Sequence, residues 1–195
     1  MIWIAFFFGL FMVYALSSWL TKLLAIAGYS LGSALTFVLV FNAGAILGAI
    51  GGAWLGDRFN IKHVLIAFYA LGAVSLTLMG FVQSSEVLFV MVFIVGASTL
   101  GTQLVAYAYA AAFYPAAIRS TGVGFASGVG RAGGIVAPII IGVIVGLQLP
   151  LEQNFMAIGL AGFLGMLAVV LINHRLFASR TPAPAGTPAI IPALD

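Results

Sequence analysis

Long apolar stretches separated by short polar segments make up most of this chain. Six of the stretches are long enough to cross the hydrocarbon core of a bilayer, which needs about 20 apolar residues. They lie at residues 2–21, 31–55, 64–83, 87–111, 121–147 and 154–173. Membrane-spanning strands would be about half as long and would alternate polar with apolar residues. The pattern therefore predicts six transmembrane α-helices.

The six predicted spans divide into two sets of three. Because three is an odd number, the second set begins on the opposite side of the membrane from the first, as in inverted repeats. The sequence thus predicts an all-α membrane domain over residues 1–175, built from two inverted three-helix repeats. Residues 176–195 contain four of the seven prolines and have no helical periodicity. They are predicted to form a disordered tail.

Composition places most of the chain in lipid and charge gives its orientation. Hydrophobic residues make up 64% of the sequence and charged residues 6%, too few for a water-soluble surface. The basic residues on one side of the predicted spans are Arg58, Lys62, Arg119, Arg175 and Arg180. The other side carries Lys22 alone. Since basic residues favour the cytoplasm, both termini are predicted to be cytoplasmic, in the inner (plasma) membrane.

Several kinds of chemistry are excluded by what the sequence lacks. It contains no cysteine, no cluster of metal-ligating side chains, and no nucleophile paired with a base. Its glycines lie inside apolar spans and do not form a phosphate-binding loop. We therefore expect no enzyme activity, no metal and no cofactor. Without a basic cluster, a nucleic-acid partner is not expected either.

Regularly spaced glycines predict close helix packing. The second span carries Gly44, Gly48, Gly52 and Gly56, one on every fourth residue, so one helix face has no side chains. Such a face lets a second helix approach closely in lipid. The fifth span has the same character, with Gly124, Gly128, Gly130, Gly134, Gly142 and Gly146.

The segment after the second span, residues 53–63, reads AWLGDRFNIKH. It resembles the loop motif that major facilitator proteins carry between the second and third helices of each half. The matching residues are Leu55, Gly56, Asp57, Arg58 and Phe59, with Lys62 at the last basic position. Ala53, Asn60 and Ile61 depart from the motif. Because Asn tolerates left-handed backbone geometry, Asn60 is expected to make the turn in place of glycine.

A second resemblance covers residues 113–138, FYPAAIRSTGVGFASGVGRAGGIVAP. This segment is similar to the loop and eleventh helix of bacterial major facilitator symporters, particularly the aromatic-acid/proton and sugar-porter-like groups. Pro115 is expected to end the preceding helix, and Ser120 or Thr121 to cap the next. The resemblance implies half of a twelve-helix fold, cut from a longer protein. An absent N-terminal six-helix half, or a second half-transporter, would then be its partner.

The candidate substrate-binding residues are polar groups within the spans. Arg131 lies about ten residues inside the fifth span, or roughly 15 Å deep, where a charge is costly unless it faces a cavity or a partner. It is either an anion-binding residue or a structural one bonded to carbonyls or snorkelling to the interface. Further candidates are Thr99, Gln103 and Tyr107 on the fourth span, with Tyr14 on the first and Asn42 on the second. Simple interhelical hydrogen bonding is the alternative for each of them.

The charged ends of the spans suggest a conformational latch. The resemblance implies that Asp57, beside Arg58 at the end of the second span, contacts Arg119 at the start of the fifth, where a helix N-terminus favours negative charge. The alternative is that Asp57 pairs only with Arg58.

The resemblance and Arg131 together predict a secondary transporter for a small organic anion such as an aromatic acid, moved with protons through the lipid bilayer. None of the four carboxylates lies within a span, so the proton-coupling acid would belong to the absent half. The alternatives are a sugar or other metabolite porter of the same superfamily, and a non-transporting six-helix membrane protein or channel.

Overall fold

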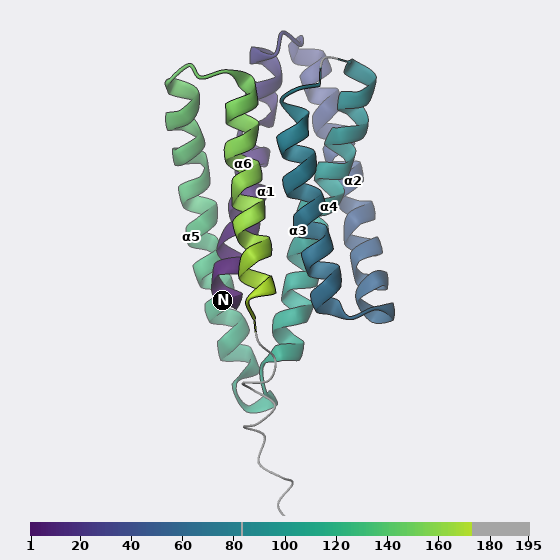
Figure 1. Cartoon of the computed structure of the whole chain (residues 1–195), viewed down its shortest axis with the longest axis vertical. Coiled ribbons are helices and arrows are strands. Elements are labelled where there is room, and N and C mark those ends of the chain that lie inside the picture. The colour runs from purple at the N-terminus through teal and green to yellow at the C-terminus, as the bar shows by residue number, and fades with distance from the viewer. Residues whose placement is uncertain (83, 173–195) are drawn as a thin grey trace, which may run out of the picture.

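The computed structural model describes residues 1–82 and 84–172. Within these ranges the chain forms six long α-helices and one short 3-10 helix, Ala116–Ile118 (Figure 1). The long helices are α1 (Ile2–Ile26), α2 (Leu31–Arg58), α3 (Ile61–Met79), α4 (Ser85–Phe113), α5 (Arg119–Gly146) and α6 (Leu151–Val170). All six are long and apolar enough to cross a membrane, which confirms the six predicted spans. The predicted tail, residues 176–195, lies outside the described residues.

The helices pack in pairs that repeat across the two halves of the chain. Helix α1 packs along α5, and α4 packs along α2 in the same way. Likewise α3 packs on α4 while α6 packs on α1, and α3 and α6 pack on each other (Figure 1). Exchanging α1 with α4, α2 with α5 and α3 with α6 leaves this set of packed pairs unchanged. The arrangement confirms the two inverted three-helix repeats that spacing predicted.

The glycine face of α2 lies directly against the backbone of α4. A Cβ on Gly44 would collide with the carbonyl group of Phe93, and a Cβ on Gly48 with that of Ala97. Gly52 is also buried in this contact, whereas Gly56 lies beyond it, at the helix end. The predicted close packing is thus confirmed for three of the four glycines.

Two boundary predictions differ from the structure. Asn60 has a φ of −62° and caps α3, its side-chain oxygen accepting from the Lys62 amide at 3.0 Å. The expected left-handed turn is therefore wrong, because an N-cap shapes this loop instead. Neither Ser120 nor Thr121 caps α5. Because the 3-10 turn leads straight into it, the helix begins earlier, at Arg119, without a side-chain cap. Pro115 follows the end of α4 as predicted.

Lys62 connects the start of α3 to the end of α6. Its ammonium group donates hydrogen bonds to the carbonyl oxygens of Val170 at 3.1 Å and Ile172 at 2.6 Å. Val170 is the last residue of α6, so its carbonyl has no partner within that helix, and Ile172 lies two residues beyond the helix end. A cation at a helix C-terminus also complements the helix dipole. Lys62, at the last basic position of the loop motif, therefore joins α3 to α6, which is far from it in sequence.

We expect Lys62→Met to lower the free energy of unfolding by about 1–2 kcal/mol, because two charge-assisted hydrogen bonds are lost while the aliphatic stem stays. Denaturant unfolding in detergent micelles measures the loss. Lys22→Met is the control, since Lys22 is exposed and its ammonium lies 4.8 Å from the Trp19 ring centroid. Equal stability of the two variants would contradict a capping role for Lys62.

Candidate functional site

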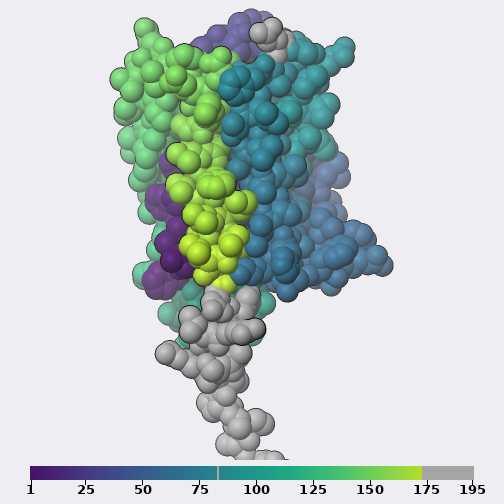
Figure 2. Space-filling model, viewed as in Figure 1, coloured from purple at the N-terminus to yellow at the C-terminus, as the bar shows by residue number. Residues whose placement is uncertain are grey.

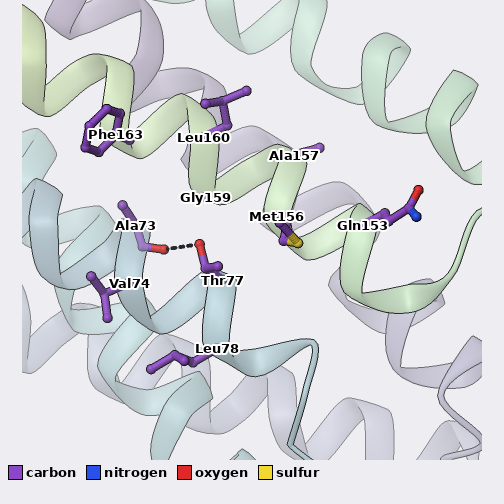
Figure 3. A pocket seen from close by; sticks show the side chains of 10 residues that line it. All are labelled: Ala73, Val74, Thr77, Leu78, Gln153, Met156, Ala157, Gly159, Leu160 and Phe163. Carbon is purple, nitrogen blue, oxygen red and sulfur yellow. Dashed lines mark hydrogen bonds between the residues drawn. The ribbon is translucent and has the colours of Figure 1, made fainter.

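A groove of about 570 Å³ lies between α3 and α6. Its walls are aliphatic and aromatic, including Val74, Leu160 and Phe163 (Figure 3). The Thr77 hydroxyl in it already donates to the Ala73 carbonyl at 2.8 Å. The two helices form one continuous face of the molecule (Figure 2). None of the residues that line this groove is cationic.

Arg131 is exposed on α5 and is not among the residues that line that groove. It is the thirteenth of the 28 residues in this helix, so it sits about 18 Å along a helix of about 42 Å. Its side chain is exposed, and no hydrogen bond joins it to any residue in the described ranges. A guanidinium group near the middle of a membrane-spanning helix is thus left with all five of its donors available.

A tyrosine–serine pair lies one helical turn from Arg131. The Tyr107 hydroxyl on α4 and the Ser127 hydroxyl on α5 are 2.8 Å apart and share a hydrogen bond. Ser127 precedes Arg131 by four residues, so the two share one face of α5. The Tyr107 ring packs edge-to-face on Phe6 of α1, with centroids 4.9 Å apart. Sequence reasoning identified Tyr107 but missed Ser127, although its spacing from Arg131 was a usable signal.

Tyr14 of α1 contacts α5 on the C-terminal side of Arg131. Its ring rests against Gly134, with Cδ2 2.7 Å from the position that a Cβ would occupy there. Tyr14 remains 47% exposed and Tyr107 37% exposed. Arg131 is therefore flanked along α5 by two tyrosines from α1 and α4, with Gly134 making room for one of them. Tyr107 thus meets α5 about one turn before Arg131, and Tyr14 meets it about one turn after.

Thr99 and Gln103 do not share that surface. Thr99 is 1% exposed and its hydroxyl donates to the Val95 carbonyl of its own helix at 2.8 Å. Gln103 is 8% exposed, and its amide lies against Gly9 of α1 without a hydrogen-bond partner in the described residues. Helix α4 packs against α1, α2 and α3, and two of its three predicted binding residues face the bundle interior. Of the three, Tyr107 alone reaches the surface.

Asn42 is exposed on α2, and its amide donates to the Val38 carbonyl of the same helix at 2.7 Å. Helix α2 packs along α4, while Arg131 belongs to α5, which packs along α1. The structure does not bring Asn42 into contact with the residues around Arg131.

The latch residues are separate in this conformation. The Arg58 guanidinium lies over the Trp54 ring, 5.1 Å from its centroid, and Arg119 donates from Nε to the Tyr114 carbonyl at 3.4 Å. Asp57 is exposed, and within residues 1–82 and 84–172 no ion pair joins it to Arg119. The cause is the pairing of α2 with α4 and of α5 with α1. A contact in another conformation remains a prediction.

Comparison with known proteins shows that the chain is similar in sequence to membrane transporters. The sequence model of the Major Facilitator Superfamily matches residues 2–192. The chain is 43% identical over 175 residues, 90% of its length, to the benzoate transport protein of Acinetobacter baylyi. It is 39% identical over 160 residues, 82% of its length, to the gentisate transporter of Corynebacterium glutamicum, and 35% identical over 172 residues, 88% of its length, to a 4-hydroxybenzoate transporter of Pseudomonas aeruginosa. It covers 38%, 36% and 38% of these three proteins respectively, so it spans about two fifths of their length.

Proposed function

Because the chain belongs to the major facilitator superfamily, we propose that it is the C-terminal half of a twelve-helix transporter that carries a small aromatic carboxylate with protons. The observation that carries the proposal is the exposed, unpaired Arg131 near the middle of α5. The similar proteins support the cargo, because benzoate, gentisate and 4-hydroxybenzoate are all aromatic acids.

The energetics of Arg131 favour an anionic cargo. Placing a guanidinium group at this depth of the membrane costs at least a few kcal/mol of free energy unless it contacts water, a partner or a ligand. A carboxylate can accept two parallel hydrogen bonds from its fork, which fixes orientation as well as affinity. Tyr14 and Tyr107 on either side offer faces and edges against which an aromatic ring packs. A sugar carries no charge to match the arginine.

A second six-helix half would complete the site. Helices α2 and α5 are the least buried of the six described spans. Of their most apolar 18-residue segments, 33% and 28% of the residues are buried inside the bundle. The polar surface around Arg131 lies on α5, one of these two helices, and on the parts of α1 and α4 that border it. A partner half placed there would enclose the cargo between two bundles and leave the apolar α3–α6 groove toward lipid.

Proton coupling would come from that second half. Asp57 lies at the last turn of α2, and Glu86 and Glu152 lie in the first turns of α4 and α6. None of these three carboxylates is in the middle of a span. By the distribution of basic residues, both termini of the chain would lie in the cytoplasm, with the protein in the inner membrane.

The test compares the chain alone with the chain joined to a partner half. We expect no uptake of labelled benzoate by liposomes that contain the chain alone. Fusion to the N-terminal half of the Acinetobacter baylyi benzoate transport protein should restore saturable uptake driven by an inward proton gradient. The intact relative is the positive control for the assay.

Two results would contradict different parts of this proposal. Gradient-driven uptake by the chain alone would show that no second half is needed. A correctly inserted fusion that takes up no aromatic acid would refute the cargo class.

A further inference from the structure

The hydroxyl pair of Tyr107 and Ser127 has unused hydrogen-bonding capacity. Two hydroxyl groups together carry two donor hydrogens and four lone pairs. Their shared bond at 2.8 Å uses one hydrogen and one lone pair. Neither oxygen has another hydrogen bond within the described residues. One donor and three acceptor sites therefore remain, directed toward whatever occupies the surface between α4 and α5.

The pair is held in place by its surroundings. The Tyr107 ring is fixed by its edge-to-face contact with Phe6, which is itself 1% exposed. Ser127 is half-buried on α5, beside Ala126, which is fully buried. The phenol and the hydroxyl come from two different helices, and the packing of the Tyr107 ring on Phe6 sets where they meet.

The distance between the pair and Arg131 matches a substituted benzene ring. Ser127 and Arg131 are one turn apart on α5, or about 5–6 Å between side-chain origins, comparable to the separation of opposite substituents on one ring. Gly128 lies between them in sequence, and a Cβ there would meet nothing within 4 Å. The backbone of α5 is therefore bare between the cation and the hydroxyl pair, and a flat ring can lie there.

Building on the proposed function, we propose that Tyr107 and Ser127 form a subsite for a ring hydroxyl, so that this protein prefers hydroxylated aromatic carboxylates. The carboxylate binds Arg131, and the ring hydroxyl donates to, or accepts from, the Tyr107–Ser127 pair. In an unsubstituted ring this contact is missing, but the two side chains still satisfy each other. The preference is therefore moderate and does not exclude benzoate.

The test measures a ratio of affinities in the fusion protein described above. Equilibrium dialysis with labelled 4-hydroxybenzoate and labelled benzoate gives the two dissociation constants. We expect 4-hydroxybenzoate to bind about three- to tenfold more tightly, as one added neutral hydrogen bond predicts. Ser127→Ala and Tyr107→Phe should each bring this ratio close to one, because each removes one hydroxyl of the pair. Ser127→Thr, which keeps the hydroxyl, should retain the preference.

The control is Ser120→Ala, which removes an exposed hydroxyl from the same helix about two turns before Ser127 and should leave the ratio unchanged. Benzoate binding reports in every variant that the protein is folded. Equal affinities for the two acids in the parent, or an unchanged ratio in both Ser127→Ala and Tyr107→Phe, would overturn the subsite while leaving the proposed function intact. Failure of the parent fusion to bind either acid would overturn both.

Discussion

Arg131→Lys is expected to weaken aromatic-acid binding by the fused transporter at least tenfold, and Arg131→Gln still more. Lysine keeps the positive charge but replaces the planar fork with a point charge, so the two parallel hydrogen bonds to a carboxylate are lost. Glutamine loses the charge as well. Hydrogen bonds to charged groups contribute about 1.5–3 kcal/mol each, so losing one corresponds to about 10- to 100-fold in affinity. Equilibrium binding of labelled benzoate measures the change.

The same variants separate a binding role from a structural one. No carbonyl or side chain in the described part of the chain bonds to the Arg131 guanidinium, so neither substitution should lower expression or the melting temperature. Arg58→Lys is the matched control, because Arg58 lies at the end of α2 over Trp54 and should leave binding unchanged. If Arg131→Lys and Arg131→Gln both bind and transport like the parent, Arg131 is structural and the anion site fails.

The helices and their repeat could be predicted from sequence because lipid imposes strict rules. A span must be long, apolar and helical, and an odd number of spans inverts the next set. The packing role of Gly44 and Gly48 could also be predicted, since glycines on every fourth residue have few other purposes in a membrane helix. Helix caps were less predictable. Asn60 and Ser120 can each make several local hydrogen bonds, and tertiary contacts decide among them.

The candidate site was predicted in part for a different reason. Periodicity states which residues share a helix face, and Thr99, Gln103 and Tyr107 do share one. It does not state which neighbouring helix covers that face. Helix α1 covers Gln103 through Gly9, whereas Tyr107 emerges beside Ser127 of α5. The Gln103 contact depends on the crossing of helices distant in sequence, and the Tyr107 contact on how the consecutive helices α4 and α5 cross.

Gly48→Leu is expected to cause the largest loss of folded protein among single substitutions in α2. A Cβ on Gly48 would overlap the backbone of Ala97, which cannot rotate away as a flexible side chain can. Helix α2 would have to separate from α4 along one of the two most extensive packed pairs of the bundle. Overpacking a well-packed contact typically costs about 1–3 kcal/mol, and a backbone collision belongs at or above the upper end of that range.

Gly51→Leu makes this prediction specific to packing. Gly51 lies on the same helix, three residues away, and a Cβ there would meet nothing within 4 Å. Leucine favours helix over glycine at both positions, so intrinsic helix propensity predicts a gain of stability in each variant. We expect size-exclusion chromatography and thermal unfolding in detergent to show a parent-like Gly51→Leu, an intermediate Gly48→Ala and a largely misfolded Gly48→Leu. Because the two leucine variants have identical composition and differ only in the helix face they occupy, equal behaviour would mean that the glycine face of α2 does not hold the bundle together.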